Sequence, residues 1–177
     1  MLKSFKISKG YNLSISGAPN QNILDVEEPR QIILHPSSID GIKTKLLVSE
    51  GDIVKVGTPL YFDKRNPEAF FVSTCSGKID KIVLGERRIV ESIYIDNDSD
   101  YKSENFDIKV SRESLLKSGL WTYIRERPFS RVASMNASPK SIFISTFSTQ
   151  PFGIDFNYLF SSTDNYLQEG INVLKKI

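Results

Sequence analysis

Short apolar runs separated by turn residues organise the first half of this chain. From residue 48 to residue 96, β-branched and aromatic residues form short runs, and Gly, Asp or Pro stands between them every few residues. This pattern is typical of short strands in a sandwich or a closed sheet. The predicted strands are Ile53-Val54, Leu60-Tyr61-Phe62, Phe70-Phe71-Val72, Ile79 to Leu84 and Ile89 to Ile95.

The residues before this stretch carry the same pattern in weaker form. Gln31 to Pro36 predicts a strand that proline ends, and Lys43 to Val48 predicts another. Residues 1–30 alternate around Gly10 and Gly17, which predicts an extended lead with one hairpin. We therefore predict an all-β domain over residues 1–96.

The hydrophobic period changes after residue 96. Ser111 is a good helix N-cap, and Gly119 stands where a helix commonly ends, so residues 112–118 are predicted to be a helix. Leu120 to Ile124 predicts one more helical turn, which stops before Pro128. Residues 97–132 are therefore predicted to be a linker with short helices.

Residues 133–177 combine one strand pattern with one helix pattern. Ser141 to Ser145 is apolar without alternation, as in a strand covered on both faces. Thr163 or Asp164 can cap a final helix with an apolar face. The residues of that face are Leu167, Ile171 and Leu174.

A strand followed by a helix is the first half of a βαβ unit, and its second strand does not follow in this sequence. The predicted fold is therefore α+β, with a β-rich module followed by the start of an α/β domain, which the family resemblance described below implies is Rossmann-like. Such a half unit leaves apolar surface uncovered. We expect a fragment of a longer protein or a chain that packs against another copy.

Composition narrows the chemistry. The net charge of the 177 residues is only +2, and no basic arm indicates a nucleic-acid partner. One cysteine and one histidine predict neither an intrachain disulfide nor a structural zinc site. The sequence has no run of about 18 apolar residues and no secretory signal pattern, so we expect a soluble, cytoplasmic chain.

Two local patterns suggest chemistry that the surrounding residues do not support. Residues 96–100 resemble the start of a calcium loop, but Tyr101 and Asp107 stand where such a loop needs glycine and glutamate. We predict a solvated linker and no metal there. Cys75 could act as a nucleophile only with His35 as its imidazole partner, and nothing in the sequence brings the two together.

The central stretch resembles the barrel-sandwich hybrid of biotinyl and lipoyl domains. The resemblance lies in Gly51-Asp52, Val54, Gly57 and Leu60, followed by Val72 to Ile79. It implies one alternative function, a carrier domain modified at Lys64. Lys64 comes too early after Gly57 for a lipoyl lysine and precedes Arg65-Asn66-Pro67, so a plain turn lysine is the competing interpretation.

Four motifs resemble a more specific family. The first three are Ile7 to Pro19, Phe62-Asp63-Lys64-Arg65-Asn66-Pro67 and Gly85-Glu86-Arg87-Arg88. The fourth extends from Ser118 to Ser130 and consists of Ser118-Gly119-Leu120-Trp121-Thr122, Arg125 and Arg127-Pro128-Phe129-Ser130. Together, and in this order, they are similar to the A subunit of the sodium-translocating NADH:quinone oxidoreductase, a family of much longer chains. The resemblance implies a protein on the cytoplasmic face of the bacterial inner membrane, peripheral and held by the other subunits. The implied complex passes electrons from NADH to ubiquinone and exports Na⁺.

The resemblance also bears on cofactors. Related electron-transport subunits bind flavin mononucleotide and NADH through a glycine-rich loop, because only glycines let backbone N–H groups close on a phosphate. Here bulky side chains follow Gly119 where that loop should stand. We therefore predict no flavin or nucleotide in this chain and no catalytic centre of its own. The flavins, iron–sulfur cluster and ubiquinone of the complex are expected to bind in or through other subunits.

An aromatic and arginine cluster takes the place of that loop. Its members are Trp121, Arg125, Arg127, Phe129 and Arg131. Such residues can fill a core, form a subunit interface, where Trp, Phe and Arg are enriched, or stack on and hydrogen-bond a quinone. The sequence leaves these three interpretations open.

Overall fold

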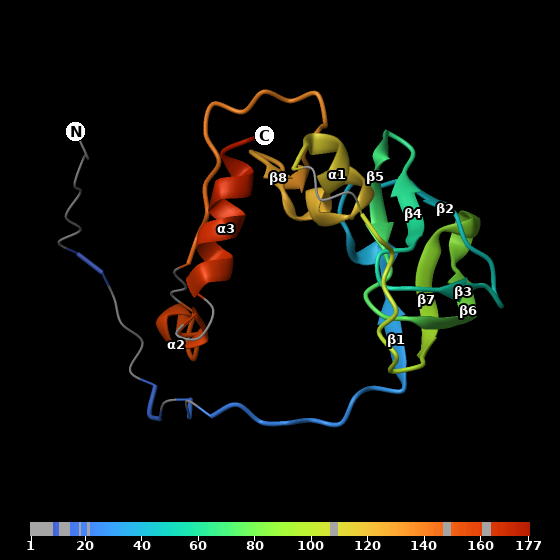
Figure 1. The fold of residues 1–177 in the computed structure, drawn as a ribbon, viewed down its shortest axis with the longest axis horizontal. Coiled ribbons are helices and arrows are strands. Elements are labelled where there is room, and N and C mark those ends of the chain that lie inside the picture. Colours follow the sequence, from blue (N-terminus) through green and yellow to red (C-terminus); the bar gives the residue numbers. More distant parts are fainter. Residues whose placement is uncertain are drawn as a thin grey trace. The chain divides into compact units, whose positions relative to one another are not determined.

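The computed structural model describes residues 9–10, 15–17, 19–20, 22–106, 110–146, 150–160 and 164–177. The chain forms two compact units, and each is described by itself. One unit comprises Val26–Lys140 with Asn172–Ile177, and the other Met1–Asp25 with Ser141–Ile171. Figure 1 traces the elements along the sequence.

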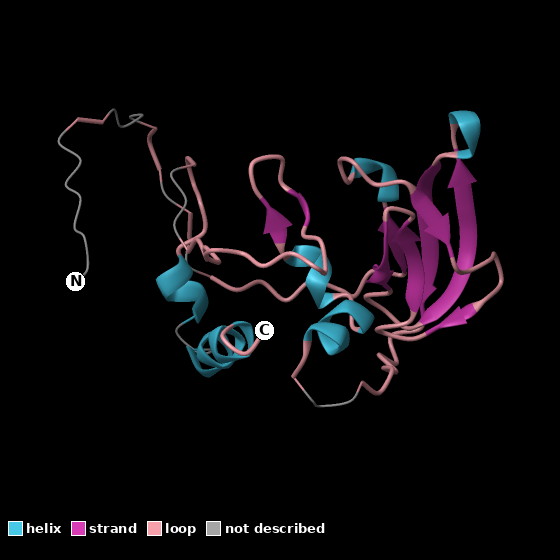
Figure 2. Ribbon diagram, turned by 90° about the horizontal axis from the view of Figure 1, so that it is seen from above, coloured by secondary structure: helices cyan, strands magenta, loops and turns pink. Residues whose placement is uncertain are grey.

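Two antiparallel sheets build the larger unit, which confirms the predicted β-rich module. The four-stranded sheet has the order β1 (Gln31–Leu34), β7 (Val90–Asn97), β6 (Gly77–Leu84), β3 (Ile53–Val54). The three-stranded sheet has the order β2 (Thr44–Leu46), β4 (Pro59–Asp63), β5 (Asn66–Val72). Figure 2 shows these strands gathered in one block. The 3-10 turns η1 (Pro36–Ser38) and η2 (Glu86–Arg88) belong to the connections.

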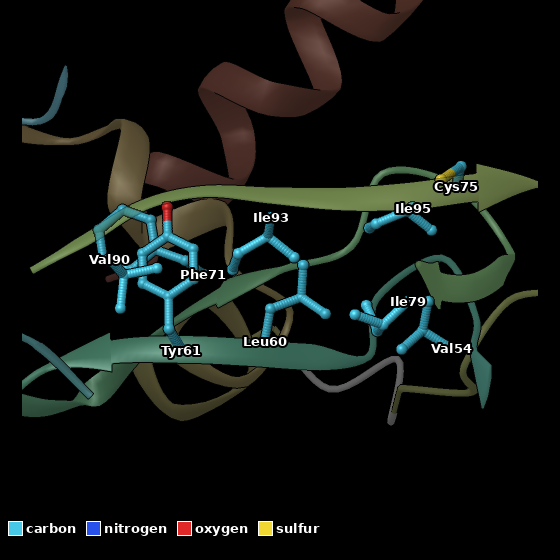
Figure 3. Close-up of a cluster of buried hydrophobic side chains, with 9 residues drawn as sticks. All are labelled: Val54, Leu60, Tyr61, Phe71, Cys75, Ile79, Val90, Ile93 and Ile95. Carbon is cyan, nitrogen blue, oxygen red and sulfur yellow. The ribbon is translucent and has the colours of Figure 1, made fainter. Parts of the chain in front are cut away.

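The hydrophobic core of this module lies between strands of both sheets (Figure 3). Its fully buried members include Leu60, Ile79, Ile93 and Ile95. Leu60 and the next residue, Tyr61, are both buried because the β4–β5 register shifts between Pro59 and Tyr61. Such a bulge breaks the usual alternation of a strand and turns two consecutive side chains inward.

At two positions only glycine fits, because neighbouring atoms leave no room for a Cβ atom and because the backbone has a positive φ angle. Gly77 has φ 149°, and a Cβ there would collide with the carbonyl oxygen of Asp96 on the paired strand. Gly119 has φ 77°, and its Cβ would lie 2.7 Å from Cγ2 of Val72. Larger residues at either position would push β6 from β7, or the turn after α1 from β5.

Short elements from residue 111 onward pack against β5. Helix α1 (Arg112–Lys117) begins at a capping box formed by Ser111 and Ser114 and ends before the left-handed Gly119, which confirms the predicted helix. The predicted turn after it is the 3-10 helix η3 (Leu120–Tyr123). The two-residue strands β8 (Arg125–Glu126) and β9 (Arg131–Val132) form a hairpin.

The last part of the chain contains α2 (Phe156–Phe160) and α3 (Asp164–Leu174). The final helix is thus confirmed, and Leu167, Ile171 and Leu174 on its predicted apolar face are half-buried. Thr163 and most of the predicted N-terminal hairpin lie outside the described residues. Among those described, no helix is long and apolar enough to cross a membrane.

One predicted strand is wrong in this structure. Residues 141–146 have no regular secondary structure, and the ring of Phe143 is 92% exposed. A strand needs a neighbour to satisfy its backbone hydrogen bonds. The structure pairs no described strand with this segment.

Candidate functional site

Trp121 lies inside the larger unit. Its side chain is 5% exposed and packs in a cluster with Ala69, Leu116 and Ala133. The indole N–H donates to the carbonyl oxygen of Ala133 at 2.8 Å. The only hydrogen-bond donor of this side chain is therefore engaged within the protein.

The same carbonyl connects two sequence motifs that are distant along the chain. Nδ2 of Asn66, at the start of β5, also donates to Ala133, at 3.3 Å. The preceding turn is fixed by Asp63, whose Oδ1 accepts from the backbone N–H of Lys43 at 2.8 Å and of Arg65 at 3.2 Å. The Asp63-to-Pro67 motif thus helps to hold the segment that carries Trp121.

Arg112 is a structural residue that the sequence did not reveal. Its guanidinium donates to the carbonyl oxygens of Met135 and Ala137, each at 3.1 Å, and to that of Ile177 at 3.0 and 3.1 Å. It also lies 6.0 Å from the centroid of the Trp121 ring. These partners are 23 to 65 residues away in sequence, so no local pattern signals the role.

The β8–β9 hairpin carries the other residues of the predicted cluster. Arg125, Arg127 and Phe129 are exposed, the ring of Phe129 by 74%. The guanidinium of Arg131 lies 5.3 Å from the centroid of that ring. Neither the guanidinium of Arg125 nor that of Arg127 forms a hydrogen bond or an ion pair with the residues that the structure describes, although the backbone of Arg125 pairs with Val132 in the hairpin. The structure therefore exposes the residues of the hairpin, whereas Trp121 is buried in the cluster against which Val132 of β9 packs.

A groove of about 560 Å³ lies between the β module and η3. The rings of Tyr61, Phe71, Phe106 and Tyr123 contribute to its walls, as does Leu120. Leu120 and Tyr123 are exposed and Tyr61 is buried. Neither this groove nor the buried position of Tyr61 follows from the strand pattern, because the bulge in β4 decides the direction of the ring.

Two family models match this chain. The model described as the NqrA N-terminal barrel-sandwich hybrid domain matches residues 5–98, and the one described as the NqrA second alpha/beta domain matches residues 107–177. The chain belongs to the NqrA family. The predicted order of a barrel-sandwich hybrid followed by an α/β domain is thereby confirmed.

Curated relatives of this family agree with the match. Proteins named as the A subunit of Na(+)-translocating NADH-quinone reductase are 38% identical in Photorhabdus laumondii, 37% in Yersinia pestis and 33% in Neisseria meningitidis. Each alignment covers 97% of this chain and 41% of the relative. The chain therefore spans about two fifths of the length of these relatives.

The family matches also locate the groove and the hairpin. Tyr61 and Phe71 belong to the first matched domain, while Leu120 and Tyr123 belong to the second. The groove is thus lined by both family domains inside one compact unit. The hairpin belongs to the second domain alone.

The remaining candidates of the sequence have defined places in this family member. Lys64 is exposed in the turn between β4 and β5, where its modification stays a prediction. Cys75 is buried, which raises the pKa of its thiol, whereas His35 is exposed before η1. A buried thiol with a raised pKa is a poor nucleophile.

The segment predicted as a solvated linker is partly anchored. Oδ1 of Asp98 accepts from the hydroxyl of the buried Ser76 at 2.5 Å, and this hydrogen bond lowers the pKa of the carboxyl. The backbone N–H of Val56 donates to Lys102 at 2.8 Å. No cluster of three or more potential metal ligands occurs in the described part of the chain.

Proposed function

We propose that this chain docks within a Na⁺-translocating NADH-quinone reductase through its β8–β9 hairpin. The observation that carries the proposal is the exposed Phe129 ring beside arginines that have no carboxylate partner within the described residues. Aromatic residues and arginine are enriched in protein interfaces, and desolvated arginine needs an acceptor. Three arginines and one glutamate stand in residues 125–131, so the partner surface is expected to be acidic.

The wider role follows the printed names of the relatives. In this proposal the complex oxidises NADH, reduces quinone and exports Na⁺, and this chain lies at the cytoplasmic face of the membrane. The chain contributes structure and docking. It holds no flavin of its own, which is supported by the bulky Leu120, Trp121 and Thr122 that directly follow Gly119.

Contact between quinone and the predicted cluster is the second candidate. It can use Arg125, Arg127 and Phe129, which share the hairpin. It loses Trp121 as a hydrogen-bond donor, because that indole already binds Ala133. The exposed ring of Phe129 is the observation that favours it, since a quinone ring can stack there.

Assembly of the complex tests the docking proposal. The full-length protein carrying Arg127→Ala with Phe129→Ala is expected to co-purify with its complex less than the wild type, most clearly at raised salt. Lys78→Ala with Lys81→Ala is the matched control, because both lysines are exposed on β6. Equal recovery of the hairpin variant and the control would contradict docking. Quinone reduction that falls while assembly is complete would instead favour quinone contact.

A further inference from the structure

The tip of the β6–β7 hairpin, residues 84–89, is exposed to solvent. Leu84 is 45% and Ile89 is 55% exposed, and Arg87 and Arg88 lie between them and are exposed as well. Figure 2 shows η2, the short helical turn of this tip, at the far end of the two long strands, in the upper right of the view. The tip therefore presents aliphatic and cationic side chains at a projecting point of the β module.

The backbone of the tip is fixed, and it holds both arginines in a conformation that is unfavourable for their residue type. The N–H of Gly85 donates to the carbonyl oxygen of Ile89 at 2.8 Å, and the N–H of Ile89 donates to that of Glu86 at 3.2 Å. Arg87 has φ 54° and Arg88 has φ 59°, in the left-handed region that glycine adopts at lower cost. Two such residues in succession indicate that the tip uses their side chains.

Both arginines lack a partner in the described part of the chain. Neither guanidinium forms a hydrogen bond or an ion pair there. Glu86 and Glu91 stand in the same end of the hairpin without pairing with them, and the carboxylate of Glu91 lies against Gly85 instead. A guanidinium has five N–H donors and keeps its charge in proteins. Both side chains can therefore bind an anion outside this module.

The tip lies at the same end of the β module as the turn between β4 and β5. Tyr61 comes shortly before that turn, Phe71 lies on the strand after it, and Val90 directly follows the tip. These three side chains meet at one end of the core cluster, while Val54 and Cys75 lie at the other (Figure 3). We call the first of these the tip end of the module.

The two ends of the module differ in charge. At the tip end, segments 40–45, 63–65 and 84–91 contain six basic and four acidic residues. At the opposite end, segments 48–52 and 96–104 contain one basic and six acidic residues. Such a separation of charge favours an orientation in which the tip end faces an anionic surface.

We propose that the tip of residues 84–89 binds the surface of a lipid bilayer that contains anionic phospholipids. In this arrangement Leu84 and Ile89 enter the boundary between headgroups and acyl chains. The guanidinium groups of Arg87 and Arg88 bind lipid phosphates. The aliphatic residues supply apolar burial, and the cations supply attraction to the charged surface, so each strengthens the contact of the other.

The shape and composition of the tip favour a lipid surface over an acidic protein. The tip projects from the module, and its residues are aliphatic, charged or glycine. Protein interfaces are enriched in aromatic residues, as in the hairpin that carries Phe129, and the tip contains none. The inference does not depend on the docking proposal, because it uses neither the β8–β9 hairpin nor its arginines.

Sedimentation with lipid vesicles tests the proposal. The full-length protein is expected to bind vesicles of phosphatidylcholine with roughly one third phosphatidylglycerol, and to bind pure phosphatidylcholine at least about tenfold more weakly. Raised salt should weaken the binding, because it screens the charges of the arginines. No binding to the anionic vesicles at low salt would overturn the proposal, and so would equal binding to both kinds of vesicle.

Glycine at the two arginine positions separates charge from folding. Arg87→Gly with Arg88→Gly removes both cations, and glycine accepts the left-handed backbone, so the fold should remain stable. Binding to the anionic vesicles should fall by roughly tenfold or more. Arg30→Ala with Lys78→Ala is the matched control, because it removes two exposed cations at the opposite end of the module. This control should change binding by less than about threefold.

Leu84→Ser with Ile89→Ser tests the apolar part of the contact. This variant should lose the binding that persists at raised salt and keep the salt-dependent part. Wild-type binding in the glycine variant, or an equal loss in the matched control, would overturn the proposal. If no vesicle binding is found and the glycine variant instead fails to co-purify with its complex, the tip binds an acidic protein surface and the lipid proposal is wrong.

Discussion

Two aromatic rings of the three-stranded sheet and the ring of Phe129 in the β8–β9 hairpin lie in opposite environments. Tyr61 and Phe71 are buried and stack on each other, whereas Phe129 is exposed beside the guanidinium of Arg131. The first pair is fixed by strand register and by the bulge in β4. The second is held by two paired residues on each strand. The buried rings therefore contribute to the stability of the fold, whereas the exposed ring of the hairpin is accessible to a binding partner.

The largest expected effect on stability comes from a substitution in the buried core. Ile93 on β7 is fully buried among both sheets, so Ile93→Ala should reduce the free energy of unfolding by about 2–5 kcal/mol. Phe129→Ala is the counterpart and should change it by less than about 0.5 kcal/mol. Urea unfolding followed by circular dichroism measures both. Similar losses in the two variants would show that the hairpin ring is packed in solution.

Arginine allows the same comparison with a smaller effect. Arg112→Met keeps the aliphatic stem but leaves the carbonyl oxygens of Met135, Ala137 and Ile177 without this donor. A loss of about 2–3 kcal/mol in the free energy of unfolding is expected, as for hydrogen bonds to a charged group. Arg125→Met on the hairpin is the control and should be nearly neutral. An unchanged free energy of unfolding in Arg112→Met would show that these three hydrogen bonds do not stabilise the fold.

The phenol of Tyr61 makes the stability of the sheets depend on alkaline pH. Because burial raises its pKa from 10.0 to about 12, the folded state holds this proton more tightly than the unfolded state does. The resulting stability is complete below pH 10 and is lost as the pH rises toward 12, by up to roughly 2 kcal/mol. Denaturant unfolding of wild type and Tyr61→Phe across this range isolates the effect. Parallel pH profiles would contradict the buried, protonated phenol.

Sequence patterns predicted the parts of the fold that local chemistry decides. Glycine and serine positions located the ends of α1, and alternation located the strands on either side of Gly77. The pattern did not predict that Leu60 and Tyr61 would both face inward, because a bulge depends on the partner strand. It failed at residues 141–145, where composition indicated a strand but none of the described residues pairs with this segment.

The candidate site shows the same limit. Arg125, Arg127 and Phe129 were predicted as a group and share one hairpin, since they are close in sequence. Trp121 was predicted with them but points to Ala133, a contact across 12 residues. Arg112 and the groove were missed. Both depend on segments that only the folded chain brings together.

The smallest expected effect concerns an exposed carboxyl tied to a buried hydroxyl. The hydrogen bond from Ser76 is the main cause of the lowered pKa of Asp98, so Ser76→Ala should raise that pKa toward the ordinary aspartate value. A depressed pKa stabilises the fold above the unfolded value of about 4, and this contribution is lost as the pH falls below it. The stability that the wild type gains over Ser76→Ala from this lowered pKa should therefore be lost only at acid pH. Side-chain carboxyl NMR titration of Asp98 in both proteins measures the shift, with Asp100 as the internal control. An unchanged midpoint for Asp98 would show that the anchoring of this segment rests on the backbone bonds of Lys102 and Glu104 instead.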